Sequence, residues 1–158
     1  MTTLVLGPAR RAEAARLAQM SRRLVENGLE PCWSTARIEH HLRHPDSTVL
    51  AARRDGRVAG FAIMQFGDEA AHLNLLAVDP GEQRRGLGRR LVGWLEETAR
   101  VAGTFLIRLE VRESNRAALA FYAALGYRQS GCVHGYYQGV EDAIRLSRNL
   151  AVAPADSR

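Results

Sequence analysis

Apolar residues recur three or four positions apart in four segments, a spacing that is typical of helices with one buried face. Helices are therefore expected over Pro8 to Asn27, from the cap Ser34 to about His44, from Leu87 through Ala99, and from the cap Ser114 or Asn115 to Leu125. Gly28 and Gly126 follow the first and last of these, and Pro45 follows the second. Glycine and proline at these places are stop signals for helices.

Shorter segments alternate apolar and polar residues or are mostly apolar, which is typical of strands. Strands are expected at the N-terminus before Pro8 and over Thr48 to Arg53, Arg57 to Gln65, Ala71 to Val78, Thr104 to Val111, Tyr127 to Tyr137 and Ala143 to Leu150. Asp55-Gly56 favours a tight hairpin between the first two internal strands, because glycine tolerates positive φ. Ala71 to Val78 is mostly apolar and is expected to be a buried central strand.

The order of these elements predicts an α/β fold, with a mixed sheet of about six or seven strands flanked by about four helices. A strand, a helix and a strand follow one another between Ala71 and Val111, which predicts a parallel βαβ unit at the centre. The chain contains no internal repeat or linker. We expect one domain over residues 1–150 and a polar tail over 151–158.

Composition and charge exclude some functions. The 158 residues are 46% hydrophobic and 25% charged, and no apolar run reaches the roughly 18 residues of a membrane helix. No signal-peptide pattern opens the chain, so a cytoplasmic protein without a membrane partner is expected. All 22 basic residues are arginine, giving a net charge of +5. They are scattered rather than clustered, so nucleic-acid binding is weakly supported, and a small polyanionic ligand suits the charge equally well.

The two cysteines, Cys32 and Cys132, lie far apart, with no CxxC spacing and no clustered histidine partners. This pattern predicts reduced thiols and no metal site. His40 and His44 are spaced by four, but no carboxylate completes a metal-binding pattern. His72 reads as an ordinary strand histidine.

The loop Gln83 to Gly88 joins the buried strand to the helix that begins at Leu87. Its two glycines let the backbone approach a ligand closely, and the unpaired N–H groups of the helix attract anions. This combination fits a cradle for a pyrophosphate, and arginines on both sides add positive charge. A glycine-rich turn of this kind also occurs as a plain strand-to-helix connection.

Four ordered motifs resemble one known family. They are Leu75 to Pro80, then Gln83 to Gly88, then Leu109 to Arg112 with Ser114-Asn115, and then Ala120 to Tyr122 with Leu125 to Tyr127. Together they resemble the GNAT superfamily of acetyl-CoA-dependent N-acetyltransferases. Within it, the bacterial ribosomal-protein-alanine N-acetyltransferases are the most similar. The resemblance covers roughly residues 58 to 150, and the first 57 residues share only the helix pattern and Trp33-Ser34.

The resemblance implies acetyl-CoA as cosubstrate and a set of residues that bind it. These are Leu76, Ala77 and Val78, whose backbone pairs with the pantetheine arm; Arg84, Arg85, Gly86, Leu87, Gly88 and Arg89, which cradle the pyrophosphate; and Asn115, which contacts coenzyme A. Asn115 can cap its helix at the same time. The N–H of Val78 is expected to face the thioester oxygen. A plain buried strand at Ala71 to Val78 is compatible with this role.

Acetyl transfer needs a base for the incoming amine and an acid for the leaving thiolate. Strand alternation sets Glu110 opposite Leu109 and Val111, and a solvated Glu110 paired with Arg108 or Arg112 is one interpretation. The resemblance implies instead that Glu110 is the general base. Tyr122 lies at helical spacing among apolar residues and can be a core tyrosine. The resemblance implies that it is the general acid.

The acceptor is left open by the sequence. An N-terminal α-amine of a protein or peptide is favoured, helped by Gly135 to Tyr137, with a small amine or a lysine side chain as the alternative. A module that binds acyl-CoA without catalysis is the alternative of another class. Strand alternation predicts that one of Tyr136 and Tyr137 faces the peptide and the other packs inside, without saying which. The oligomeric state is also open.

Overall fold

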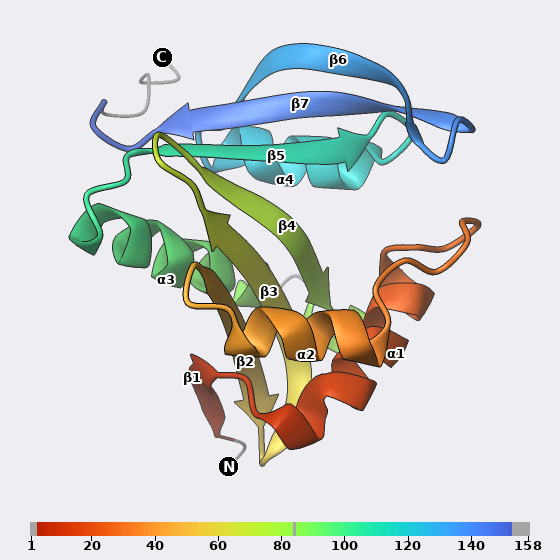
Figure 1. The fold of residues 1–158 in the computed structure, drawn as a ribbon, viewed down its shortest axis with the longest axis vertical. Coiled ribbons are helices and arrows are strands. Elements are labelled where there is room, and N and C mark those ends of the chain that lie inside the picture. The colour runs from red at the N-terminus through yellow and green to blue at the C-terminus, as the bar shows by residue number, and fades with distance from the viewer. Residues whose placement is uncertain (1–2, 84, 153–158) are drawn as a thin grey trace.

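The computed structural model of the chain describes residues 3–83 and 85–152, and its strands form one mixed sheet (Figure 1). The seven strands lie in the order β1-β2-β3-β4-β5-β7-β6. Their bounds are β1 Leu4–Pro8, β2 Ser47–Arg54, β3 Arg57–Phe66, β4 Ala71–Val78, β5 Leu106–Arg112, β6 Arg128–Tyr137 and β7 Glu141–Asn149. Neighbouring strands are antiparallel except β4 and β5, which are parallel. The predicted fold class and central βαβ unit are confirmed.

In the part of the chain that the structure describes, four α-helices and two short 3-10 turns connect the strands. The helices are α1 Ala14–Leu24, α2 Thr35–Arg43, α3 Leu87–Val101 and α4 Arg116–Ala124, and the turns are η1 Arg11–Glu13 and η2 Pro80–Glu82. The Ser34 side chain accepts a hydrogen bond from the Arg37 N–H at 3.1 Å, as expected of the α2 N-cap. Asp55 and Gly56 both have positive φ, which confirms the predicted hairpin turn.

The first predicted helix begins too early. Pro8 ends the edge strand β1, where it lies opposite Leu50, and α1 starts only at Ala14. Proline lacks an N–H and is tolerated at a sheet edge, and its carbonyl accepts a hydrogen bond from Arg53 Nη2 at 2.9 Å. The residues between Pro8 and Ala14 therefore lie outside the α-helix, and Arg11–Glu13 form the short turn η1.

Helices cover both faces of the sheet and bury two separate apolar clusters. One cluster packs α3 and α4 against one face and includes Leu91, Leu95 and Ile107. The other packs α1 and α2 against the opposite face and includes Leu17 and Ile38. The sheet is the wall between the two clusters.

A bulge in β4 changes which face its side chains reach. Met64 of β3 lies opposite Leu73, and the preceding Ile63 lies opposite Leu75, so Asn74 has no partner on β3. Leu73 consequently belongs to the α3 cluster, whereas Leu75 belongs to the α1 cluster. One extra residue thus reverses the alternation for the rest of the strand.

The parallel pairing of β4 with β5 is short. It joins Ala71 to Ile107 and His72 to Arg108, and beyond these two pairs the strands separate (Figure 1). The remainder of the β4 edge, through Val78, faces β5 without a strand partner. The N-terminus of α3 lies just after this open edge along the chain.

Candidate active site

A cavity of about 1110 Å³ opens between the separated strands. It exceeds the roughly 300–1,000 Å³ of ordinary small-molecule sites. We call one part of its wall the glycine-loop end, made of Leu76, Ala77 and Val78 on β4, Gly86, Leu87, Gly88 and Arg89 at the start of α3, and Asn115 before α4. The tyrosine end is made of Trp33 and Arg37 near α2 and of Tyr136, Tyr137 and Gln138 on the β6–β7 hairpin. Glu110 and Tyr122 line the same cavity.

The glycine-loop end presents main-chain groups. Gly86 is the N-cap of α3 with φ +77°, a left-handed conformation that glycine adopts without a steric cost. No side chain of the described residues caps the helix, and the first intrahelical bond runs from the Arg90 N–H to the Gly86 carbonyl. The N–H groups of the first turn are therefore free to bind an anion.

Gly88 has a role that its sequence context does not reveal. A Cβ built on Gly88 would lie 3.1 Å from the ring of Phe121, whereas a Cβ on Gly86 would meet open space. Gly88 is thus needed for the close contact between α3 and α4. Gly86 and Gly88 both line the cavity, and their role in the approach of a ligand stays a prediction.

The arginines near the loop differ in position. Arg84, predicted to hold the pyrophosphate, lies outside the described residues. Arg85 is 3.9 Å from Glu82 and does not line the cavity, whereas the exposed Arg89 does. Asn115 caps α4 by accepting a hydrogen bond from the Ala118 N–H at 3.1 Å while also lining the cavity.

Glu110 lies on β5, and its carboxyl is paired within the sheet. Its side chain is 8% exposed, with Oε2 2.5 Å from His72 Nε2 and Oε1 3.4 Å from Arg145 Nη2. Burial would raise the pKa of this carboxyl, but His72 and then Arg145 outweigh burial and hold the pKa below its ordinary value. The expected alternation of β5 is confirmed. The interpretation that pairs Glu110 with Arg108 or Arg112 is wrong, because Arg112 binds Glu141 instead.

His72 connects Glu110 to a chain of polar groups on β4 and β3. Its Nδ1 contacts the Asn74 side-chain oxygen, and the Asn74 amide donates to Gln65 Oε1 at 3.5 Å. The hydrogen bond to Glu110 raises the pKa of His72 above its ordinary value, against the effect of burial. Treating His72 as an unremarkable strand residue missed this contact. The sequence carried no signal for this contact, because the register that pairs His72 with Arg108 is set by the folded sheet.

Tyr122 is both a core residue and a cavity residue. It is 7% exposed, belongs to the α3 cluster and packs edge-on against Phe121 and Tyr127. Within the described part of the chain its hydroxyl has no hydrogen-bond partner, and burial raises its pKa. Tyr127 differs, since its hydroxyl donates to Glu96 at 3.0 Å. The Tyr122 hydroxyl is thus a proton donor on a buried residue that lines the cavity and is available to a ligand.

Both tyrosines of the β6–β7 hairpin line the cavity, contrary to the prediction that one would turn inward. Their rings meet edge-on at 5.0 Å. The pairing of β6 with β7 is irregular between Val133 and Tyr137, and Gly135 has φ +64°. Both rings therefore contribute to the cavity wall, with Tyr136 the more exposed of the two.

Side chains from distant segments hold the tyrosine end together. The amide of Gln138 makes two hydrogen bonds to the Glu30 backbone, of 2.9 Å from the Glu30 N–H and 2.7 Å to its carbonyl. Glu26, 7% exposed, accepts hydrogen bonds from the backbone N–H groups of Cys32 and Trp33. The guanidinium of Arg37 stacks 3.9 Å from the Trp33 ring centre. Sequence reasoning did not identify Glu26 or Gln138.

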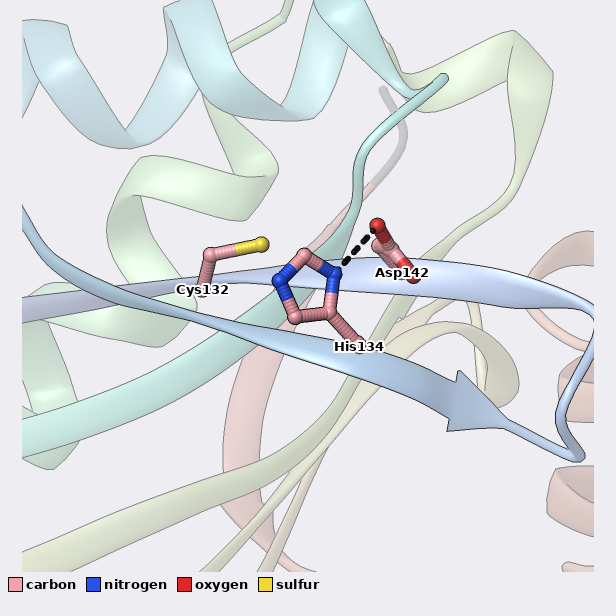
Figure 2. A group of neighbouring side chains, drawn as sticks. All are labelled: Cys132, His134 and Asp142. Carbon is pink, nitrogen blue, oxygen red and sulfur yellow. Dashed lines mark hydrogen bonds and ion pairs between the residues drawn. The ribbon is translucent and has the colours of Figure 1, made fainter.

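A second polar cluster lies away from the cavity on the β6–β7 hairpin (Figure 2). Cys132, His134 and Asp142 bring ligand-type atoms within 4.8 Å of one another, with the imidazole between the thiol and the carboxylate. His134 Nδ1 is 3.0 Å from Asp142, whose other oxygen accepts from the Gly135 N–H at 2.8 Å. Cys132 therefore has a histidine neighbour, which the sequence interpretation denied. The spacing Cys-x-His on one strand face was the available signal.

The combination of a split β4–β5 pair, a glycine-capped helix and a cavity between them is matched by a known family. Residues 14–127 match the model of the Acetyltransferase (GNAT) family. The chain belongs to this family. It is an N-acetyltransferase, as the sequence resemblance indicated, and the fold of this family uses acetyl-CoA as cosubstrate.

Two bacterial relatives are named as N-acetyltransferases. The [Ribosomal protein bS18]-alanine N-acetyltransferase of Salmonella typhimurium is 46% identical over 106 residues, covering 65% of this chain and 72% of the relative. The N-alpha-acetyltransferase RimI of Mycobacterium tuberculosis is 34% identical over 151 residues, covering 92% of each chain.

Solved structures show the same fold. The ribosomal-protein-S18-alanine N-acetyltransferase from Escherichia coli superposes with a TM-score of 0.82 at 28% identity, covering 99% of each chain. A Thermoplasma acidophilum N-acetyltransferase in complex with coenzyme A has a TM-score of 0.80 at 15% identity, covering 93% of this chain and 99% of the other. Within residues 3–83 and 85–152, no helix combines the length and apolar character needed to cross a membrane.

Proposed function

We propose that the chain transfers the acetyl group of acetyl-CoA to the N-terminal α-amine of a protein, with an N-terminal alanine of a ribosomal protein as the first candidate. The observation that carries this proposal is the single cavity that joins the glycine-loop end to the tyrosine end past Glu110 and Tyr122. The names of the relatives from Salmonella typhimurium and Mycobacterium tuberculosis support the choice of acceptor.

The donor fits the glycine-loop end. The unpaired edge of β4 offers backbone groups to the pantetheine arm, as an added strand would. The first-turn N–H groups of α3 bind the pyrophosphate, helped by the exposed Arg89. Residues 1–150 act as one domain in this proposal, since both ends of the cavity belong to the same sheet.

The chemistry needs two proton transfers. An incoming ammonium loses a proton to Glu110, and the neutral amine attacks the thioester carbonyl. Tyr122, a cavity residue whose hydroxyl has no partner among the described residues, donates a proton to the departing thiolate. The proton that the nitrogen gives up on amide formation balances that donation. One proton is released overall for each amide and thiol formed. The enzyme works in the cytoplasm, where new protein N-termini appear.

A peptide panel tests the acceptor. Peptides that begin with Ala, Ser, Gly or Met are incubated with acetyl-CoA, and free thiol and peptide mass are measured. The matched controls are the same peptides with a blocked N-terminus and with an internal lysine added. Acetylation at the free N-terminus is expected. Turnover of small amines or of internal lysine alone contradicts the choice of acceptor, and coenzyme A binding with no turnover contradicts catalysis. Because the chain lacks lysine, its own side chains add no acetyl-lysine background.

A further inference from the structure

Glu110 and His72 border two cavities. Both line the large cavity, and both line a second cavity of about 490 Å³. The second cavity has the side chains of Arg108, Arg145, Ser130 and Ser147 in its wall, none of which lines the large cavity. The pair thus borders polar surroundings beyond those that an acceptor peptide would occupy.

The hydrogen bonds around His72 define where its protons lie. The Asn74 amide nitrogen donates to Gln65, so the Asn74 oxygen faces His72 Nδ1, and Nδ1 must carry a hydrogen. The other nitrogen, Nε2, is 2.5 Å from Glu110 Oε2. Two acceptors do not approach one another favourably, so a proton between Nε2 and Oε2 would stabilise this contact. The pair is therefore arranged to bind one proton more strongly than Glu110 would alone.

The strengths of the two groups as bases support the same arrangement. An α-amino group has a pKa of about 8, whereas the Glu110 pKa is held below its ordinary value of 4.5. Transfer to Glu110 alone is thus unfavourable by at least about 1,000-fold. The pKa of His72 lies above its ordinary value of 6.5, which reduces the mismatch to less than about 100-fold.

We propose that Glu110 and His72 accept the proton of the incoming ammonium as one unit, with Glu110 receiving it and His72 holding it until it leaves through the smaller cavity. The proposal rests on the proposed acetyl transfer. The N–H bond of the ammonium breaks, a hydrogen bonded to the pair replaces it, and water in the smaller cavity then takes the proton. His72 acts through Glu110 and is a positioning residue in this scheme.

The charged groups around the pair limit how strongly it holds a proton. Arg145 of β7 contacts Glu110 at 3.4 Å and lowers the pKa of both Glu110 and His72, and Arg108 of β5 lines the same small cavity. Tyr136 and Tyr137 of β6 line the large cavity with the pair. The positive charge of Arg145 therefore favours loss of the proton from the pair after each turnover.

The pH dependence of kcat tests the pair directly. With saturating acetyl-CoA and peptide, the parent enzyme is expected to gain activity as pH rises through a pKa above 6.5, because the pair must be unprotonated to act. The His72→Gln substitution keeps a hydrogen-bond donor beside Glu110 but cannot hold the proton. We expect kcat to fall about 10- to 100-fold and this limb to move to lower pH, with KM for acetyl-CoA unchanged. His40→Gln, on the outer part of α2, is the matched control.

Chemical rescue supplies the second readout. In His72→Ala, added imidazole is expected to restore part of kcat by occupying the space of the lost ring. Pyrazole, of the same size but far less basic, is expected to restore none. Equal effects of the two additives, or a His72→Gln variant with parental kcat and pH profile, overturn the pair. These results leave the proposed function standing as long as the parent enzyme acetylates a peptide. A parent enzyme without peptide turnover refutes the proposed function first.

Discussion

The glycine-loop end and the tyrosine end of the cavity are built in different ways. The first comes from one short stretch of chain, Leu76 to Arg89, with Asn115 added, and offers mainly backbone groups. The second joins segments far apart in sequence through side chains, as Gln138 does when it binds Glu30 across 108 positions. A backbone site depends on local conformation, whereas a side-chain site depends on tertiary contacts. Substitutions can therefore damage one end and spare the other.

The largest expected effect is at Glu110, which lies between the two ends. Glu110→Gln keeps the shape but removes the base, so kcat should fall about 100- to 10,000-fold while KM for acetyl-CoA stays within about twofold. Glu97→Gln on the exposed side of α3 is the control. Steady-state kinetics with each substrate varied measures both constants. Parental kcat in Glu110→Gln would show that another group takes the proton.

Tyr122→Phe removes a hydroxyl without a partner among the described residues, so folding should be preserved. We expect kcat to fall by about 100-fold, at the lower end of the effect of a general acid, with coenzyme A affinity unchanged. Titration calorimetry with coenzyme A and turnover assays separate the two quantities. A loss of coenzyme A affinity equal to the loss of kcat contradicts the role as acid.

Two glycines of α3 test whether the glycine-loop end depends on close packing between helices. Gly88→Ala would press its new methyl group against Phe121, so the free energy of unfolding should fall by about 1–3 kcal/mol, together with coenzyme A affinity. In Gly93→Ala the new methyl group has no atom within 4 Å, so the free energy of unfolding should rise by about 0.5–1 kcal/mol. Urea unfolding measures both. If the two variants behave alike, the contact between α3 and α4 is not the reason for Gly88.

At the tyrosine end, Gln138→Ala removes both hydrogen bonds to Glu30. A net hydrogen-bond contribution of about 1 kcal/mol, if lost from peptide binding, corresponds to a rise of roughly fivefold in KM for the acceptor peptide. KM for acetyl-CoA should not change. Gln129→Ala, at an exposed position on β6, is the control. An equal rise in both KM values would show that the two ends are coupled.

The smallest expected effect is on the stability of the fold at low pH. Hydrogen bonds from Ser114 and then Arg112 lower the pKa of Glu141 from 4.5 to about 2. A group whose pKa is lower in the folded state contributes stability above the unfolded value, and that contribution is lost as pH falls from 4.5 towards 2. Glu141→Gln should therefore flatten the fall of the melting temperature across this range. If the melting temperature of the variant falls with pH as steeply as that of the parent, other groups cause the acid sensitivity.

The same difference explains what could be predicted from the sequence. The order of strands and helices, the Asp55-Gly56 hairpin and the α3 helix follow from local spacing and are confirmed. The early end of the β4–β5 pairing and the bulge at Asn74 could not be found, because register depends on partners elsewhere in the sheet. The helix predicted from Pro8 was wrong for a similar reason, since the β1 edge determines where that proline lies.

The candidate site divides along the same line. The residues predicted at the glycine-loop end, apart from Asn115, fall in two short runs close together in the sequence, and those in the described part line the cavity except Arg85. Glu110 was found through a motif, but its partner His72 lies 38 positions away and was read as ordinary. Gln138 and Glu26 carried no motif at all. Their importance arises from the folding of two distant loops against each other.

The open edge of β4 also bears on how such an enzyme can diversify over generations. Carbonyl and N–H groups are present whatever the side chain, so a binding site made of backbone groups tolerates most amino-acid substitutions. The tyrosine end, with Trp33, Tyr136 and Tyr137, is made of side chains, so each substitution there changes the surface that an acceptor contacts. A lineage can therefore exchange one acetylated target for another while inheriting its means of holding the donor intact.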